Sequence, residues 1–463
     1  MSEPSVFSEL LGSIWAAAGG APAQLAAVEA HGSGALPSVF AVTDLAAASV
    51  AAAGAAVAEL VATAGGAVPQ VRVDRRLASL WFSMSIRPMG WDLPPAWDAI
   101  AGDYATADGW IRLHTNAPHH RAAALSVLGT AADKAAVAAA VALWRADTLE
   151  AAVVAAGGCA AAMRSRAQWA VHPQGLAVAA EPLLALSAGE AAGRPDWRVP
   201  ADRPLSGVRV LDLTRILAGP VATRFLAGFG ADVLRIDPLD WDEPSLAPEV
   251  TPGKRCARLD LKDAGALAVL EGLLAQADVI VHGYRSDALE RLGFSAARRR
   301  ALNPALVEVC LDAYGWSGPW NRRRGFDSLV QMSTGIAQAG MELLGRDRPT
   351  PLPVQALDHA AGYILATAAV RGLTQRLTTG AGGTARTSLA RVAELLVGAG
   401  TAAPGPALAP ETPDDRSPEL EQTVWGPAQR LVPPLTVSGT ALRWSRPAGP
   451  LGSAPAEWGA RGG

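Results

Sequence analysis

Two aspartates stand where an extended segment gives way to an apolar, alanine-rich stretch. Asp358 lies in PLPVQALDHAAGYILATAAVRGL, and Asp44 takes the same place in SVFAVTDLAAASVAAAGAAVAEL. Most aspartates at a helix start are ordinary N-caps. A carboxylate can also attack an acyl group and form a covalent intermediate, which requires its ionised form. The dipole of the helix favours that ionised form, and nearby backbone N–H groups could hold a developing oxyanion, so both aspartates are candidate nucleophiles.

Each of the two aspartates begins the same predicted series of elements. An Ala-rich helix, a turn that contains glycine, a short strand and a second helix follow Asp44, and the same order follows Asp358. Self-similarity of this kind predicts a partial duplication within the chain.

Composition excludes several classes of protein. The 463 residues carry a formal net charge of −3 and lack the basic footprint of a nucleic-acid binder. The densest basic run, NRRRGFD, is short and is typical of a solvated loop. Apolar segments such as residues 46–64 are interrupted by Gly and Glu, so we expect core helices and no membrane span.

The cysteines indicate the compartment. Cys159, Cys256 and Cys310 form no CxxC pair and no even-numbered framework, so free thiols in a reducing compartment are expected. The N-terminus shows no charged region followed by an apolar one. We therefore expect a cytoplasmic protein.

The chain divides into five regions by pattern. After the linker, apolar strands alternate with helices, which predicts an α/β fold with a parallel sheet and a ligand site at the carboxyl ends of its strands. The predicted regions are an Ala-rich helical segment (1–95), a small α+β domain (96–185), a polar, proline-containing linker (186–204), a Rossmann-like domain (205–397) and a Pro/Gly-rich tail without regular structure (398–463).

The first strand-to-helix turn of the Rossmann-like region reads LDLTRILAGP, residues 211–220. This turn is not GxGxxG, so dinucleotide binding is poorly supported. A sharp turn from strand to helix still exposes backbone N–H groups, and these suit a phosphate or polyphosphate group.

Five ordered motifs together resemble the family III coenzyme A (CoA) transferases, which include formyl-CoA transferase, the carnitine CoA-transferases and α-methylacyl-CoA racemase. The motifs are GVRVLDLTRILAGPVATRFLAGFGADVLRID, GKRCARLDLK, ADVIVHGYRSDALERLGF, GFDSLVQMSTG and ALDHAAGY. They cover residues 205–395. The segment from DYATADGWIRLHTN through AQWAVHPQG also resembles the small domain of that family.

The resemblance implies a Rossmann-like CoA-binding domain and assigns site residues. The position that matches the family's nucleophile is Asp358. The positions that match CoA contacts are Ile216, Leu217, Ala218, Tyr284, Arg291 and Arg324. Guanidinium groups suit the phosphates of CoA, and an aromatic ring such as that of Tyr284 could stack on adenine.

The activity implied by this resemblance is transfer of CoA from an acyl-CoA to a carboxylic acid through an aspartyl-CoA thioester. An acyl-CoA racemase or isomerase is an alternative, but the position at which that branch carries a proton-shuttling histidine is Phe326 here. A catalytically inactive acyl-CoA-binding protein is a further alternative. Neither His359 beside Asp358 nor the trio His114, His119 and His120 fits a catalytic or zinc pattern, so no metal is expected.

The order of regions departs from the family. Small-domain-like sequence precedes the linker here, which indicates a circularly shifted and partly duplicated arrangement. Asp44 has no GFD-type motif before it, so we expect it to be a remnant. The resemblance also implies a homodimer.

Overall fold

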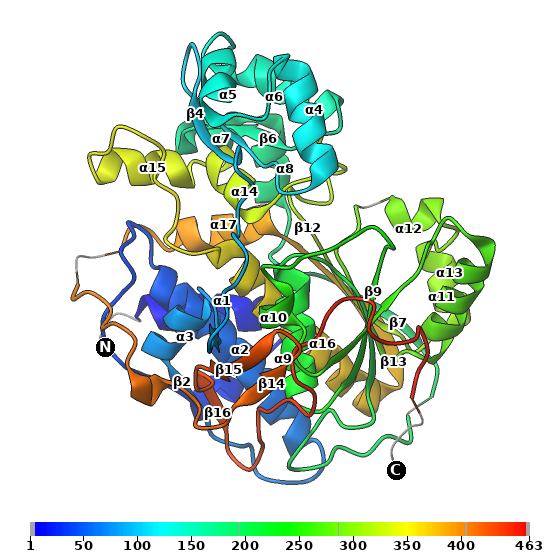
Figure 1. The fold of residues 1–463 in the computed structure, drawn as a ribbon. Helices are drawn as coiled ribbons and strands as arrows, with labels where there is room; N and C mark the ends of the chain where they lie inside the picture. The colour runs from blue at the N-terminus through cyan, green and yellow to red at the C-terminus, as the bar shows by residue number, and fades with distance from the viewer. Residues whose placement is uncertain (1–4, 194, 286, 403–404, 460–463) are drawn as a thin grey trace.

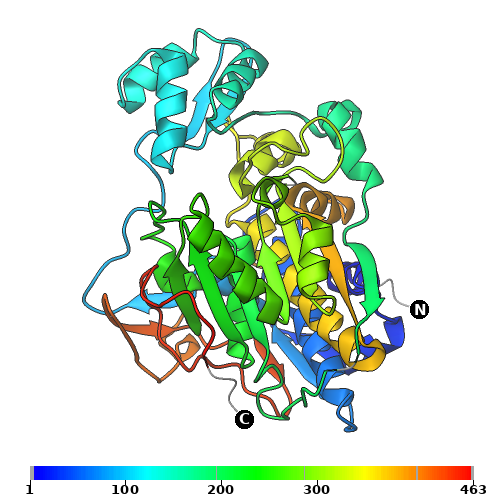
Figure 2. The same cartoon turned by 90° about the vertical axis from the view of Figure 1, so that its right-hand side faces the viewer.

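The computed structural model describes residues 5–193, 195–285, 287–402 and 405–459. At its centre lies a sheet with helices on both faces (Figures 1 and 2). In the described part of the chain the sheet has seven strands, in the order β10-β9-β8-β11-β12-β13-β7. In chain order these strands are β7 (Ala185–Ala191), β8 (Arg209–Leu213), β9 (Asp232–Asp237), β10 (Lys254–Arg258), β11 (Val279–His282), β12 (Val307–Asp312) and β13 (Ala381–Ser388).

The strand order shows where a ligand would bind. Strands β8 to β13 run parallel, and only β7 pairs antiparallel, at the edge beside β13. Successive strands are added outward from β8 on one side and from β11 on the other, so the winding reverses between these two strands. Ligands of such sheets bind at this switch point, beyond the carboxyl ends of the strands. The predicted α/β class with a Rossmann-like parallel sheet is confirmed.

The apolar strands separate two layers of helices. Val210, Val281 and Val309 lie in one core with α9 (Ala218–Gly228) and α16 (Ala356–Thr379). Leu211 and Ile280, from alternate positions, lie in the other core, with α11 (Ala264–Gln276). Because side chains alternate across a strand, runs such as RVLDL and VIVH can be apolar on both faces. The remaining helices of this half are α10 (Ala247–Val250), α12 (Ala288–Arg291), α13 (Ala296–Leu302), α14 (Asp327–Ser333), α15 (Ile336–Leu343) and α17 (Leu389–Gly398).

A second apolar helix, α2 (Val42–Ala62), packs along α16. Val50 and Tyr363 line the same small void, and Glu59 pairs with Arg371 further along both helices, so α2 and α16 run in the same direction. By length and composition α2 could cross a membrane, but 83% of its most apolar window is buried inside the protein, as expected of a core helix. Its neighbours in the chain are α1 (Val6–Ala17), η1 (Pro22–Ala27), β1 (Val28–His31), β2 (Val71–Asp74), α3 (Arg75–Trp81) and β3 (Ile86–Pro88).

A small domain stands apart at the top of Figure 1. Its antiparallel sheet has the order β4-β5-β6, and its core includes Tyr104, Ile111 and Val153. Its elements are β4 (Gly102–Ala105), β5 (Trp110–Leu113), α4 (Pro118–Leu128), α5 (Lys134–Val141), α6 (Ala146–Ala155) and β6 (Ala160–Ala162). Helices α7 (Arg166–Val171) and α8 (Pro173–Ala180) then lead back to β7.

Two expectations of irregular structure are wrong in part. The segment expected to be a linker begins with β7, which joins the large sheet. The tail contributes β14 (Glu421–Thr423), β15 (Gly426–Arg430) and β16 (Leu435–Val437), besides the short turn η2 (Pro413–Asp415). β15 pairs with β3 and β16 with β2, more than 300 residues earlier in the chain, as the register of Arg430 with Ile86 and of Leu435 with Val73 shows. Such short strands depend on distant partners, which the local pattern does not reveal.

Candidate active site

Asp358 is the third residue of α16 and lies at the carboxyl edge of the large sheet. Only 5% of its surface is exposed. One turn further on, Gly362 lies so close to α9 that a Cβ there would stand 2.6 Å from the carbonyl oxygen of Ala218. Residues four apart share a helix face, and both helices begin at this edge. Asp358 is therefore held level with the turn that precedes α9.

This turn, which contains the predicted CoA contacts Ile216, Leu217 and Ala218, has a strained backbone. Ile216 has φ = 67° and is the one non-glycine with positive φ among the described residues. A left-handed conformation costs roughly 1–2 kcal/mol for a residue with a Cβ. The N–H of Ile216 donates to Glu243 Oε1 at 2.6 Å, and Arg235 holds the other oxygen of Glu243 at 2.9 Å. Buried anchors thus hold the turn in a shape that its own sequence does not favour, which is common at ligand sites.

A second acid, Asp327, caps the helix that carries Asp358. Its Oδ2 accepts from the N–H of Leu357 at 2.9 Å and from the N–H of Asp358 at 3.0 Å. Its Oδ1 accepts from Gln331 Nε2, and Gln331 Oε1 in turn accepts from the N–H of Leu352 at 2.7 Å. Asp327 is fully buried. The amides at the start of α16 are therefore bound by Asp327.

This arrangement corrects the expectation that the helix start favours an ionised Asp358. Burial raises the pKa of Asp358 well above its usual range, and the neighbouring charge of Asp327 raises it further. Burial also raises the pKa of Asp327, to about 6, although its bonds to Gln331 and to the amides of α16 oppose the rise. In the absence of a ligand the pair retains a proton, and Asp358 is the acid that holds it.

The small domain covers this pair. Phe326, next to Asp327, stacks on His114 with ring centroids 3.7 Å apart. His120 Nε2 lies 3.6 Å from Cys159 Sγ, and burial lowers the pKa of His114 to about 3 and that of His120 to about 4. The two histidines are therefore neutral at physiological pH and behave as aromatic packing between the domains.

The other predicted CoA contacts lie at the same edge of the sheet. Tyr284 follows β11 and is half-buried, and the guanidinium carbon of Arg215 lies 5.9 Å from its ring centroid. Arg291, at the end of α12, has 57% of its side chain exposed and pairs with Asp287 at 3.3 Å. Arg324 is exposed, and its Nη1 lies 3.4 Å from the carbonyl oxygen of Gly157.

The structure adds two arginines that sequence reasoning missed. Burial lowers the pKa of Arg285, and the charges of Arg324 and Arg291 lower it further. Burial likewise lowers the pKa of His119, with contributions from Arg324 and Arg215. Four guanidinium groups therefore gather at the switch point, a pattern that suits a polyanion. Arg215 directly precedes Ile216, and Arg285 directly follows Tyr284. Their position next to predicted CoA contacts could have identified them from the sequence.

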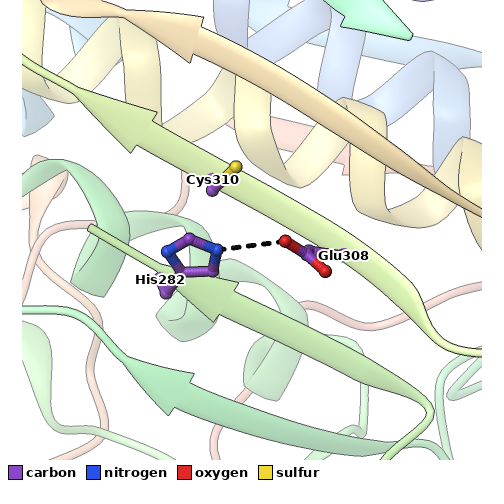
Figure 3. Close-up of side chains that lie close together, drawn as sticks. All are labelled: His282, Glu308 and Cys310. Atoms are coloured by element: carbon purple, nitrogen blue, oxygen red, sulfur yellow. Dashed lines mark hydrogen bonds and ion pairs between the residues drawn. The ribbon is translucent and has the colours of Figure 1, made fainter. Parts of the chain in front are cut away.

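A cluster of metal-ligand residue types on β11 and β12 does not fit a metal ion. Ligand atoms of His282, Glu308 and Cys310 lie within 4.8 Å of one another (Figure 3). His282 Nε2 is 3.3 Å from Glu308 Oε1, but Arg299 holds both oxygens of that carboxylate, at 2.5 and 2.9 Å. A cation would have to displace this guanidinium. The cluster is instead a buried ion network that ties β11 and β12 to α13.

Asp44 occupies the equivalent helix position but a different environment. Each aspartate is the third residue of its helix, and the preceding residues Ala41 and Gln355 have nearly the same φ and ψ, −75° and 58° against −74° and 63°. The elements α2, β2 and α3 follow the same order as α16, β13 and α17. Arg75 holds Asp44 at 2.6 Å, and among the described residues no side chain caps the start of α2.

The sequence profile of CoA-transferase family III matches residues 205–423. The resemblance is confirmed over this part of the chain. The succinyl-CoA:glutarate CoA-transferase of Mus musculus is 31% identical over 205 residues, 41% of this chain and 46% of that protein. The succinyl-CoA–D-citramalate CoA-transferase of Chloroflexus aurantiacus is 30% identical over 195 residues, 39% of this chain and 48% of that protein.

The alignments cover only part of this chain and only part of each relative. The chain spans about half the length of the curated relatives that it matches. The crystal structure of Rv3272 from M. tuberculosis aligns with a TM-score of 0.37 at 30% identity, over 42% of this chain and 57% of that one. The family profile extends 26 residues beyond the predicted domain end at 397, to residue 423, the last residue of β14. The sequence matches support an enzyme of the CoA-transferase type.

Proposed function

We propose that this protein transfers CoA from an acyl-CoA to a carboxylic acid, with Asp358 as the covalent nucleophile. The observation that carries the proposal is the placement of Asp358 level with the strained turn at Ile216 and beneath the small domain, at the same edge of the sheet as the four arginines. The arginines suit the phosphates of CoA, and the turn suits the part of CoA that leads toward the thioester.

The reaction proceeds in two halves. The Asp358 carboxylate attacks the thioester carbonyl, the C–S bond breaks, and a mixed anhydride and CoA thiolate form. The thiolate attacks the aspartyl carbonyl and releases the first acid as a carboxylate, which leaves an aspartyl-CoA thioester. The acceptor carboxylate repeats the two steps in the opposite direction, so that its acyl-CoA and free Asp358 are produced.

Asp327 acts as a positioning residue in this scheme. It fixes the first turn of α16 through two backbone amides, and Gln331 fixes Asp327. Its charge also keeps a proton on Asp358 until the substrate arrives. Before it attacks the thioester, Asp358 releases this proton to water, so that the attacking group is the carboxylate.

A trapping experiment tests the nucleophile. The full chain is incubated with a panel of acyl-CoAs, quenched with hydroxylamine and mapped by mass spectrometry. A hydroxamate is expected at Asp358, and Asp358→Asn abolishes it and lowers transfer about a thousandfold or more. Asp44→Asn is the matched control, because Asp44 holds the same helix position, and it should leave both readouts unchanged. A mark at Asp44 would overturn the assignment.

The alternatives give different outcomes in the same panel. If no residue is marked but the α-proton of the acyl group exchanges with deuterium from solvent, the protein is an acyl-CoA racemase or isomerase. The contact between His114 and Phe326 favours the racemase as the second candidate. Phe326 stands where the racemase branch carries a histidine, and His114 places an imidazole next to that position. CoA binding with neither mark nor exchange indicates an inactive acyl-CoA-binding protein.

A further inference from the structure

A cavity of about 780 Å³ lies far from Asp358, between the two parallel helices and the large sheet. Helices α2 and α16 contribute the second halves of their lengths, and β7, β12 and β13 contribute the floor. Ala368, the residue of its wall nearest to Asp358 in α16, is ten positions further along, which is about 15 Å at 1.5 Å per residue. Gly383 and Ala385 lie in the first part of β13, so the cavity is at the amino end of the sheet.

The cavity exists because its walls are built from very small side chains. Ala and Gly residues face the space from the turn after α1 and from α2, α16, β7 and β13, and no described side chain fills it. These residues are Ala18, Gly19, Ala55, Ala62, Ala188, Ala368, Gly372, Gly383 and Ala385. Protein interiors normally pack to the density of an organic crystal, and 780 Å³ lies within the range of small-molecule pockets.

The charged side chains of the lining form ion pairs within the protein, although Arg371 Nη1 itself has no hydrogen-bond partner among the described residues. Arg371 pairs with Glu59 at 3.1 Å, and Gln24 Nε2 donates to the same carboxylate at 2.8 Å. The third charged residue of the lining, Glu308, is bound by Arg299 on the other face of the sheet. An ionised ligand would therefore enter a largely apolar space without a free counter-charge, which is costly.

The rim combines apolar and neutral polar side chains. Leu186 and Val68 are 51% and 54% exposed there. Hydroxyl and amide groups that line the cavity and are exposed belong to Thr63, Ser187, Gln375 and Thr378. Such a lining suits an aliphatic body inside and one neutral polar group at the mouth.

We propose that this cavity is a second binding site, separate from the active site, for an uncharged aliphatic molecule with one neutral polar end group. The site does not depend on the proposed CoA-transferase activity. It lies between the two halves of the chain, and its α16 wall continues directly to Asp358.

Binding to the full-length protein tests the site. Octan-2-one is the neutral probe and octanoate its charged counterpart, each titrated by calorimetry and by ligand-detected NMR. We expect octan-2-one to bind at least about tenfold more tightly than octanoate, because burial of an unpaired carboxylate opposes the gain from the chain. Equal affinities, or no binding of octan-2-one, would overturn the proposal.

Two cavity-filling variants locate the site. Ala188→Leu on β7 and Ala62→Leu on α2 are partly exposed and should fold, which a melting curve verifies. Both should weaken octan-2-one binding about tenfold or more, since the added side chain occupies the space. Ala191→Leu, on the same edge strand but outside the lining, is the matched control and should bind as the wild type does. Unchanged binding in both filling variants would show that the probe binds elsewhere.

Discussion

At the scale of single residues, the acids of this protein are set apart by what their oxygens touch. Asp327 accepts from two backbone amides and a glutamine, whereas burial and the neighbouring charge of Asp327 both raise the pKa of Asp358, which is 5% exposed. Two carboxylates in one buried site cannot both ionise without cost. Asp327, whose oxygens accept three hydrogen bonds, therefore carries the charge, and Asp358 carries the proton.

Asp327→Asn should move the acid limb of the pH dependence of kcat/KM to lower pH. The substitution removes the charge that raises the pKa of Asp358, so the carboxylate forms at lower pH. It also weakens the cap of α16, at a cost of about 1–3 kcal/mol in stability. The limb is measured in the transferase assay, with Asp44→Asn as the control that should not shift it. A limb that stays in place or moves upward would contradict this role.

Asp312, at the end of β12, should make the protein less stable as pH rises. Burial raises its pKa to about 8, with Glu181 adding to the rise and Arg386 opposing it. The unfolded chain releases this proton at about pH 4, whereas the folded chain keeps it up to about pH 8. The stability present at low pH is therefore lost as the pH rises from about 4 to about 8.

Asp312→Asn removes this loss. The free energy of unfolding of the variant, relative to that of the wild type, should rise by roughly 2–5 kcal/mol from about pH 4 to about pH 8. Urea unfolding at both pH values measures it. Asp347→Asn, at a side chain that is 86% exposed, is the control and should show no such gain. If the difference in unfolding free energy between the variant and the wild type stays constant across this pH range, Asp312 is ionised in the folded protein.

At the scale of elements, the site depends on how closely α16 approaches its neighbours. Gly362 meets the first turn of α9, and a Cβ there would stand 2.6 Å from Ala218 O and 2.9 Å from Val221 Cβ. Near the other end of α16, a Cβ on Gly372 would stand 2.6 Å from Val307 Cγ1. Both glycines allow close packing, but only Gly362 sets the distance from Asp358 to the turn at Ile216.

Gly362→Ala and Gly372→Ala form a matched pair within one helix. Each should cost about 1–3 kcal/mol of stability by overpacking. Only Gly362→Ala should also lower kcat/KM for acyl-CoA, since it displaces Asp358 from the turn. Urea unfolding and steady-state kinetics separate the two effects. Equal kinetic losses in both variants would show that α16 transmits strain along its whole length.

At the scale of the whole molecule, distant parts of the chain meet in one buried ion network. Glu249 accepts from Arg224, Ser85 and Arg430, and it is fully buried. Ser85 directly precedes β3, Arg224 lies in α9, and Arg430 ends β15. The N-terminal half, the Rossmann-like sheet and the tail are therefore joined at this point.

Glu249→Leu should destabilise the whole chain by about 3–5 kcal/mol, because two buried guanidinium groups lose their counter-charge. A single cooperative transition at lower urea concentration is expected. Glu411→Leu removes a more exposed partner of Arg87 and Arg416 and should cost about 1 kcal/mol or less. Two separate transitions in Glu249→Leu would mean that the halves fold independently.

The homodimer implied by the family resemblance remains a prediction at this scale. Sedimentation equilibrium should give twice the mass of one chain. The mass of a single chain would instead favour a monomer in which α2 covers α16, so that no second subunit is needed there.

The sequence by itself determined the elements and the chemistry carried by local motifs. Buried strands such as VIVH need only apolar residues in a short run, and the parallel sheet follows from their alternation with helices. The family motifs identified the turn at Ile216 and the helix of Asp358 because both are contiguous in the chain. The repeated order of elements after Asp44 and Asp358 could also be read locally.

Only the tertiary structure decided the state of the site. The cap on α16 comes from Asp327, about thirty residues earlier, and it reverses the expected ionisation of Asp358. The covering histidines belong to a domain more than 200 residues earlier in the chain, and β7 and the tail strands form only because distant strands supply partners. Burial and Coulomb interactions depend on distances in space, and a linear pattern fixes these only where the interacting residues share one element.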